Sequence, residues 1–384
     1  MEPATRIGIG ARLPGGRRID LPKPERGRYG RSREDPPRGP RVRGRGRAAG
    51  GPRRRRHRLA RPGGLTVHRV VAVANAKGGV GKTSLTAGLA GLVAHTGYRV
   101  LTVDADPQGN LCRDLGYPAG DGQSLALAIQ NGFELAPLRQ VRPNLDCVPG
   151  GAALFDIPAT YISRMARGQT MTGLRDALLR IEPAPPHSGD YDLVLVDTPP
   201  GEPVIQELIF RAADYVIIPT RSDDASLDGL VMVAHRFATA RANNERLTLL
   251  GVLLFGVRSG STRLRERVRL ALEDALEGVA PVFDTTIRYL ESAAVDMRRH
   301  GLLPYELEQR HARERSERLA RLRSRQPAAG RDDLLSRDAA GLAGDYVALA
   351  KEVLAAIATA EADHDATPAN AEPARRPSRG PLPG

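Results

Sequence analysis

Two lysines bracket a run of glycines in a chain that otherwise uses arginine for its positive charge. Only four of its 57 basic residues are lysines. Two of the four belong to one segment, which reads Lys77, Gly78, Gly79, Val80, Gly81, Lys82, Thr83. Glycines let backbone N–H groups point at an anion, a lysine ammonium is a compact charge for phosphate oxygens, and a threonine hydroxyl can ligate Mg²⁺. The segment predicts a phosphate-binding loop, with Ser84 as a further contact.

The residues on both sides of this loop have the pattern that a phosphate loop requires. Residues 70–74 are apolar and mostly β-branched, which predicts a buried parallel strand. Residues 83–94 predict an apolar helix that begins at the loop. The phosphates are therefore expected at a helix N-terminus, where free amides and the helix dipole favour anions.

Two other segments place carboxylates at the ends of apolar runs. Asp104 and Asp106 follow the run 98–103, and Asp197 follows the run 193–196. The carboxyl ends of parallel strands form one edge of a sheet, and ligands bind there. Asp-x-Asp-Pro alone is a common turn, and a strand can end in an aspartate that is merely solvated. Beside a glycine-rich loop, however, all three aspartates are expected to face the phosphates and their metal.

Together these motifs resemble the deviant P-loop of the ParA/MinD family of ATPases. Ala76 stands where the general P-loop pattern has glycine, and Lys77 precedes two glycines, as in that family. The sequence Asp-Thr-Pro-Pro that begins at Asp197 is closest to the ParA-type partition ATPases.

The resemblance implies ATP as the nucleotide and Mg²⁺ as its metal. It implies three metal-binding side chains, Thr83, Asp104 and Asp197. It also implies three catalytic residues: Lys82 at the outer phosphates, Asp106 at the attacking water, and Lys77 reaching the nucleotide of a partner subunit. The last role implies that the chain forms an ATP sandwich homodimer.

ParA-type proteins also bind DNA without sequence preference and have a ParB-like partner that prompts hydrolysis. The resemblance therefore implies partition of plasmid or chromosomal DNA and a cytoplasmic, nucleoid-associated location. The candidate DNA contacts are Arg263 and Arg288, with Arg298 and Arg299 nearby. Few aromatic residues accompany them, so contact would be to phosphates rather than by base stacking.

Short apolar runs alternate with helical patterns from residue 70 to about residue 301. Strands are expected at 70–74, 98–103, 145–148, 192–196, 215–218 and 249–255, and helices at 83–94, 226–241 and 262–276. This alternation predicts an α/β fold, a mostly parallel sheet covered by helices on both faces. Beyond it, the pattern predicts a charged helix at 305–326 and an apolar helix at 343–360.

Composition divides the chain into four parts. They are a disordered Arg/Gly/Pro-rich tail at 1–66, a ParA-like P-loop ATPase domain at 67–302, a C-terminal helical extension with an Arg-rich insertion at 303–360, and a disordered tail at 361–384. The first 68 residues carry 20 basic and 5 acidic residues, whereas the whole chain has a net charge of +13. The basic tail is expected to bind phosphate polymers, to be solvated without a partner, or to reflect a start codon assigned too far upstream.

Other functions on the same scaffold require features that are missing here. A MinD-like ATPase on a membrane would end in a basic amphipathic helix, a tyrosine kinase in a tyrosine cluster, and a metal-cluster carrier would have paired cysteines. The last tyrosine is Tyr346, the only cysteines are Cys112 and Cys147, and no apolar run has membrane-spanning length. The sequence thus predicts no membrane partner. Positioning of a protein cargo and nucleotide-gated regulation stay open as alternatives.

Overall fold

One sheet organises the part of the chain that the computed structural model describes, which is residues 69–181, 191–222, 224–257, 266–270, 272–273, 281–324 and 341–366. Its strand order is β3-β4-β2-β5-β1-β6-β7-β8. The strands are β1 (Val70–Val73), β2 (Val100–Asp104), β3 (Leu138–Arg142), β4 (Leu145–Val148), β5 (Leu193–Asp197), β6 (Tyr215–Thr220), β7 (Thr248–Val257) and β8 (Val282–Arg288). Every neighbouring pair is parallel except β3 with β4, so the expected mostly parallel sheet is confirmed.

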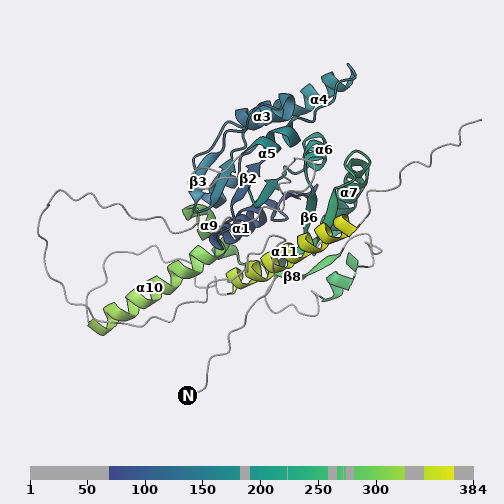
Figure 1. Cartoon of the computed structure of the whole chain (residues 1–384). Helices are drawn as coiled ribbons and strands as arrows, with labels where there is room; N and C mark the ends of the chain where they lie inside the picture. Colours follow the sequence, from purple (N-terminus) through teal and green to yellow (C-terminus); the bar gives the residue numbers. More distant parts are fainter. Residues whose placement is uncertain are drawn as a thin grey trace, which may run out of the picture.

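Helices cover both faces of the sheet, as expected (Figure 1). One face carries η1 (Ala152–Asp156), α3 (Gln123–Asn131), α4 (Ile157–Met165), α5 (Gly173–Arg180), α6 (Pro203–Ala212) and α7 (Asp224–Arg241). The other carries α1 (Lys82–His95), α2 (Leu111–Leu115), α9 (Glu291–His300), α10 (Pro304–Ser324) and α11 (Leu342–Ala366). Along β1, Val70 and Ala72 pack into the first layer and Val71 and Val73 into the second. A strand buried on both faces is apolar at every position, as this one is.

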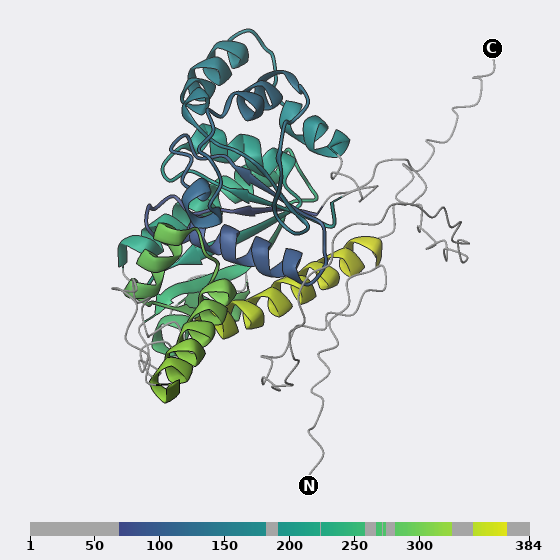
Figure 2. The ribbon, with the colours of Figure 1, turned by 90° about the vertical axis from the view of Figure 1, so that its left-hand side faces the viewer.

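The C-terminal helix α11 belongs to the same core as the helix that follows the glycine-rich loop. In Figures 1 and 2 it runs beside α1, and it also packs on β8. A Cβ atom at Gly88 of α1 would lie 2.4 Å from the Tyr346 ring, so only glycine permits this approach. The Tyr346 hydroxyl donates a hydrogen bond to the Ser84 carbonyl oxygen at 3.1 Å. Residues on both sides of position 302 therefore share one hydrophobic core.

Two strands of the sheet have no counterpart among the expected ones. The residues of β3 are exposed or half-buried, and β8 buries only Phe283 and Ile287 between polar neighbours. Both strands lie at the two edges of the sheet. Edge strands are covered on fewer sides, so their residues need not form the continuous apolar run that marks an inner strand.

Several expected segments can be compared only in part. The charged helix is α10, which points away from the sheet, and the apolar helix is α11, which continues six residues past its expected end. Of the helix expected at 262–276, residues 266–270 and 272–273 are helical and the others lie outside the described residues. The tail expected at 1–66 lies outside them as well, as does the chain from 367 on. None of the described helices is long and apolar enough to span a bilayer.

Candidate functional site

The glycine-rich loop connects β1 to α1 at the carboxyl edge of the sheet. Gly79 and Gly81 have φ angles of 73° and 93°, which residues with a Cβ rarely adopt. Gly81 is the N-cap of α1, and no side chain caps this helix. The first amides of α1 are therefore directed at the loop, which is the arrangement that binds phosphate at a helix N-terminus.

Lys82 lies within this loop rather than on the surface. Its side chain is buried, and its ammonium donates a hydrogen bond to the Lys77 carbonyl oxygen at 2.9 Å. Burial lowers the pKa of Lys82, while the carboxylates of Asp197 and Asp106 raise it. The structure thus brings the predicted lysine and two predicted aspartates into one electrostatic cluster.

The aspartates meet because of the strand order. Strands β2, β5 and β1 are adjacent, and Asp104 pairs in register with Asp197, which pairs with Val73 on its other side. The two Asp104 oxygens accept hydrogen bonds from the backbone N–H groups of Asp106 at 3.1 Å and Leu111 at 3.0 Å. Burial raises the pKa of Asp104 to about 7, against the effect of these two donors. Asp104 therefore holds the turn after β2.

Asp197 differs from Asp104 because neither of its carboxylate oxygens has a hydrogen-bond partner, although the residue is fully buried. Burial, and to a smaller extent the charge of Asp104, raises the pKa of Asp197 well above its ordinary value. The Thr83 hydroxyl and the Lys82 ammonium oppose this shift. A buried carboxylate without partners is costly unless a cation or donor satisfies it. The donor set around Asp197 therefore fits a hard divalent cation.

This donor set would not bind a metal by itself. Among the described residues, no group of three or more His, Cys, Asp or Glu side chains is arranged to hold a metal ion. Mg²⁺ usually takes one or two carboxylates and completes its shell with water and substrate phosphates. Thr83, Asp104 and Asp197 supply one hydroxyl and two carboxylates, a set that fits Mg²⁺ bound together with substrate phosphates.

Asp106 is held close to the loop by the backbone around it. Its Oδ1 accepts a hydrogen bond from the Gln108 N–H at 2.9 Å. A Cβ atom at Gly150, after β4, would lie 2.6 Å from the carbonyl oxygens of both Asp104 and Asp106. The sequence reasoning missed Gly150, and the available signal was the pair of glycines that follows Pro149 after the strand predicted at 145–148.

A buried polar network behind the loop was also missed. The Asn75 side chain accepts a hydrogen bond from the Lys77 N–H at 2.9 Å and donates one to the Pro219 carbonyl oxygen at 2.8 Å. The Gln206 amide donates to the Asn75 and Pro199 carbonyl oxygens at 3.4 and 3.1 Å. This network joins the loop to β6 and α6. The sequence feature that could have indicated this network is Asn75, a single polar residue at the end of an apolar strand.

Ser84 and the proposed DNA contacts have partners of their own. The Ser84 hydroxyl donates to Asp114, which also pairs with Arg298 at 3.2 Å. Arg288 forms a two-pronged ion pair with Asp345 of α11, with both N–O distances 2.7 Å. Arg299 also has an interaction partner, and Arg263 lies outside the described residues. Sequence position alone had not indicated any of these partners.

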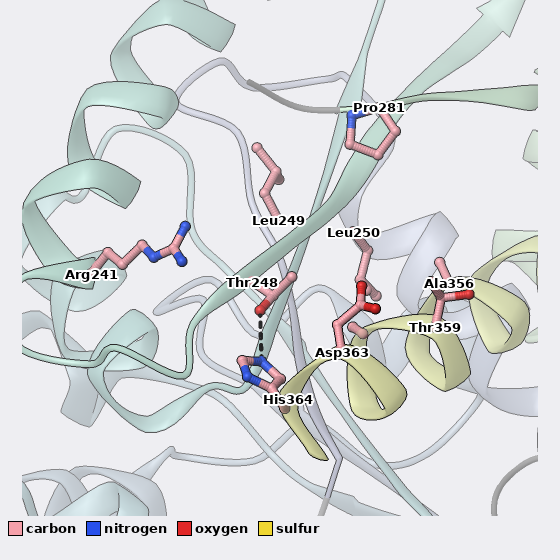
Figure 3. A pocket seen from close by; sticks show the side chains of 10 residues that line it. Arg241, Thr248, Leu249, Leu250, Pro281, Ala356, Thr359, Asp363 and His364 are labelled. Atoms are coloured by element: carbon pink, nitrogen blue, oxygen red, sulfur yellow. Dashed lines mark hydrogen bonds between the residues drawn. The ribbon is translucent and has the colours of Figure 1, made fainter. Parts of the chain in front are cut away.

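A cavity of about 530 Å³ lies far from this cluster, between the C-terminal part of α11 and the start of β7 (Figure 3). Apolar side chains such as Leu249 and Leu250 line it, and the Thr248 hydroxyl and His364 lie within 3.2 Å of each other at its rim. Because it is at the amino end of β7, it contains none of the residues that the motifs indicate.

Comparisons with known sequences agree with the geometry. A family model described as an AAA domain matches residues 68–249. The chromosome partitioning protein ParA of Caulobacter vibrioides is 34% identical over 190 residues, which cover 48% of this chain and 68% of that protein. The chromosome-partitioning ATPase Soj of Thermus thermophilus is 35% identical over 205 residues, which cover 53% and 75%.

A solved structure gives the same result for the fold. Cobyrinic acid a,c-diamide synthase from Mycobacterium smegmatis, with bound ADP and magnesium, aligns with a TM-score of 0.51 and 29% identity over 61% of this chain and 93% of that chain. The resemblance inferred from the motifs is confirmed, and this chain belongs to the ParA/Soj family of P-loop ATPases.

Proposed function

We propose that this chain hydrolyses ATP with Mg²⁺, dimerises when ATP is bound, and holds DNA non-specifically in that state to drive DNA partition. The observation that carries the proposal is that a buried Lys82 ammonium lies close enough to Asp197 for the two charges to influence each other, while neither oxygen of this buried carboxylate accepts a hydrogen bond. The role in partition is supported by relatives that are named as chromosome partitioning proteins.

Binding of ATP would use the loop and Lys82 together. The ammonium exchanges its hydrogen bond to the Lys77 carbonyl oxygen for the outer phosphates, which are stronger acceptors because they are charged. Thr83, Asp104 and Asp197 would hold the metal, which when bound neutralises charge on the phosphates. In that complex the unfavourable free energy of burying the Asp197 carboxylate would be offset.

Asp106 is proposed to orient the attacking water. Its Oδ1 is fixed by the Gln108 N–H, and among the described residues its Oδ2 makes no hydrogen bond. A carboxylate with one anchored and one open oxygen suits the positioning of a water molecule. Phosphoryl transfer depends on such positioning and on charge neutralisation more than on covalent chemistry.

Lys77 is proposed to act on the nucleotide of a second copy. Its backbone is fixed by Asn75, and a Cβ atom at Gly229 of α7 would lie 3.3 Å from the Lys77 Cβ. The position from which the Lys77 side chain extends is therefore fixed. Hydrolysis and dimerisation would then depend on each other.

Contact with DNA and with a ParB-like activator is proposed from the resemblance of the motifs to ParA-type partition ATPases. Arg288 would have to exchange Asp345 for a DNA phosphate in order to contribute, and Arg263 belongs to a part of the chain that is not described. Positioning of a protein cargo would use the same nucleotide cycle without DNA. A membrane role is not favoured because α11 is packed against α1 and β8.

The test measures ATP hydrolysis with and without non-specific DNA, and the molar mass by light scattering with ATP. The full chain should form a dimer with ATP, and DNA should raise its hydrolysis rate. Lys77→Ala should bind ATP yet stay monomeric, whereas Lys351→Ala, which changes a lysine on α11, should behave as the unaltered protein. An intact ATP dimer of Lys77→Ala would contradict the role of Lys77.

A variant that lacks residues 1–66 tests whether DNA binds to the dimer surface or to the basic tail. Retained ATP-dependent binding, weakened steeply by salt, would support the dimer surface. Loss of DNA binding in this variant would indicate that the basic tail binds DNA. If neither form binds DNA, the partition proposal fails and the protein-cargo alternative becomes the better account.

A further inference from the structure

Helix α10 has no part in the chemistry described so far. Pro304 and Leu307, near its beginning, are buried, but none of its described side chains after Leu307 is. Figures 1 and 2 show the helix extending away from the sheet. At a rise of about 1.5 Å per residue, the part from residue 308 to residue 324 is about 25 Å long. Most of this helix therefore lies outside the hydrophobic core.

Two glutamates hold the beginning of α10 against the domain. Glu306 accepts a hydrogen bond from the Arg142 side chain at 2.7 Å and another from the Leu303 N–H at 2.8 Å. Glu308 accepts one from the N–H of Gly341, just before α11, at 2.9 Å. Both carboxylates are thus engaged at the base of the helix, and the helix leaves the domain from a fixed starting point.

The exposed part of α10 contains more arginine than its own glutamates can neutralise. Residues 309–324 include six arginines and two glutamates. Arg310 forms an ion pair with Glu314 at 3.2 Å. Three other arginines are exposed, and among the described residues their side chains make no hydrogen bond or ion pair: Arg313, Arg315 and Arg323. These guanidinium groups remain available to an anion from outside the chain.

The arginines are distributed around the helix rather than along one side. With about 3.6 residues per turn, positions 310, 313, 315 and 323 fall on four different sides of the helix axis. A helix that rests on one flat anionic surface has its basic residues on a single face. Arginines on all sides instead suit a helix with negative charge on both of its flanks.

A bilayer surface would require a continuous apolar face, which α10 lacks. The apolar positions 312, 319 and 322 share one side of the helix because of their spacing. Arg315 falls on that same side and interrupts it. A partner would therefore recognise α10 through its positive charge rather than through apolar contact.

We propose that α10 is a DNA-binding arm that lies in the major groove and pairs its arginines with the phosphates of both strands. An α-helix is about 10–12 Å across and the major groove is about 12 Å wide, with phosphates along both of its sides. Arginine suits this contact because its guanidinium can form two parallel hydrogen bonds with a phosphate. Contacts to phosphates carry no sequence information, so binding by the arm is independent of sequence.

This inference rests on the proposed function, because it takes DNA as the partner of the chain. It places the contact on a helix outside residues 68–249, which the family model matches. Arg288, by contrast, is already paired with Asp345. The arm needs no existing ion pair to be broken at Arg313, Arg315 or Arg323.

The experiment measures the affinity of the full chain, with ATP and Mg²⁺, for a DNA duplex of random sequence at several salt concentrations. The variant Arg313→Gln/Arg315→Gln/Arg323→Gln removes three charges from α10. Its affinity should fall about 30-fold, and the slope of log affinity against log salt should become shallower by about 2–3. Lysine at the same three positions keeps the charge and should bind DNA within about fivefold of the unaltered protein.

The matched control is Arg167→Gln/Arg241→Gln/Arg246→Gln, which removes the same charge from exposed arginines outside α10. It should bind DNA within about threefold of the unaltered protein, with an unchanged salt slope. Hydrolysis of ATP without DNA should be equal in all variants, because none of these arginines belongs to the phosphate site.

The outcomes separate the arm from the function on which it rests. Equal affinities and salt slopes for the two glutamine variants would overturn the arm, and so would a lysine variant as weak as the glutamine variant of α10. Tighter binding of the unaltered protein to phosphatidylglycerol vesicles than to DNA, lost in the α10 variant, would overturn it in favour of a membrane partner. Failure of the unaltered protein to bind DNA with ATP would instead contradict the proposed function.

Discussion

The two sides of the P-loop are built in opposite ways. On the phosphate side, defined as Lys82, Asp104, Asp106 and Asp197, every residue is at most 6% exposed. On the other side, at the carboxyl ends of β6 and β8, Tyr289 is 38% exposed and Arg221 is half-buried. The first side is closed to solvent, and the second is open to it.

This difference determines how strongly charges interact on each side. Charges act more strongly on each other where water is excluded, so groups that neutralise phosphates gain from burial. Substitutions on the phosphate side should therefore have the larger effects.

Lys82→Ala is expected to have the largest effect. It removes the cation that faces Asp197 and Asp106, so the phosphates meet two buried carboxylates without compensation. ATP affinity in a calorimetric titration should fall about 100-fold or more, equivalent to about 2.7 kcal/mol. Lys351→Ala is the matched control. Undiminished affinity would break the contrast between the two sides, because the buried charge would then be irrelevant to binding.

Asp106→Ala tests whether the phosphate side holds a water molecule as well as phosphates. Turnover should fall about 100-fold, because the water loses its positioning carboxylate. ATP affinity should stay within about threefold and the ATP dimer should persist. Steady-state hydrolysis, calorimetry and light scattering measure these three quantities. A variant that turns over normally would remove Asp106 from the mechanism.

Gly150→Ala tests the rigidity of the phosphate side without altering its charge. The new Cβ would lie 2.6 Å from two backbone oxygens, which cannot move without shifting Asp104 and Asp106. The free energy of unfolding by urea should fall by about 1–3 kcal/mol. Gly344→Ala on α11 is the control, since nothing lies within 4 Å of its Cβ position. Equal stability of the two variants would mean that the turn adapts.

Arg288→Ala, at the end of β8, should have the smallest effect and sharpens the contrast from the open side. It removes the partly exposed ion pair with Asp345, at a cost of about 0.5 kcal/mol in the free energy of unfolding. ATP affinity should stay within about threefold, because this ion pair lies outside the phosphate side. Loss of ATP-dependent DNA binding with unchanged stability would instead favour the DNA contact expected from the sequence.

The sequence by itself determined the loop and its lysines, the aspartates at the ends of β2 and β5, and the alternating α/β pattern. These features are local. Glycines are needed where φ is positive, as at Gly79 and Gly81, and strands buried on both faces must be apolar throughout. The family could be identified from such short segments because their spacing and residue types encode the phosphate chemistry directly.

Only the tertiary structure decided which of these residues become neighbours. Asp104 and Asp197 are 93 positions apart in sequence and meet because β5 lies between β2 and β1. Arg288 is paired with Asp345 because α11 packs back on β8, and an arginine expected at a DNA surface is thereby bound within the protein. Long-range pairs of this kind depend on strand order and helix packing. No local pattern carries that information, so the roles of chemically similar residues were separated only by the fold.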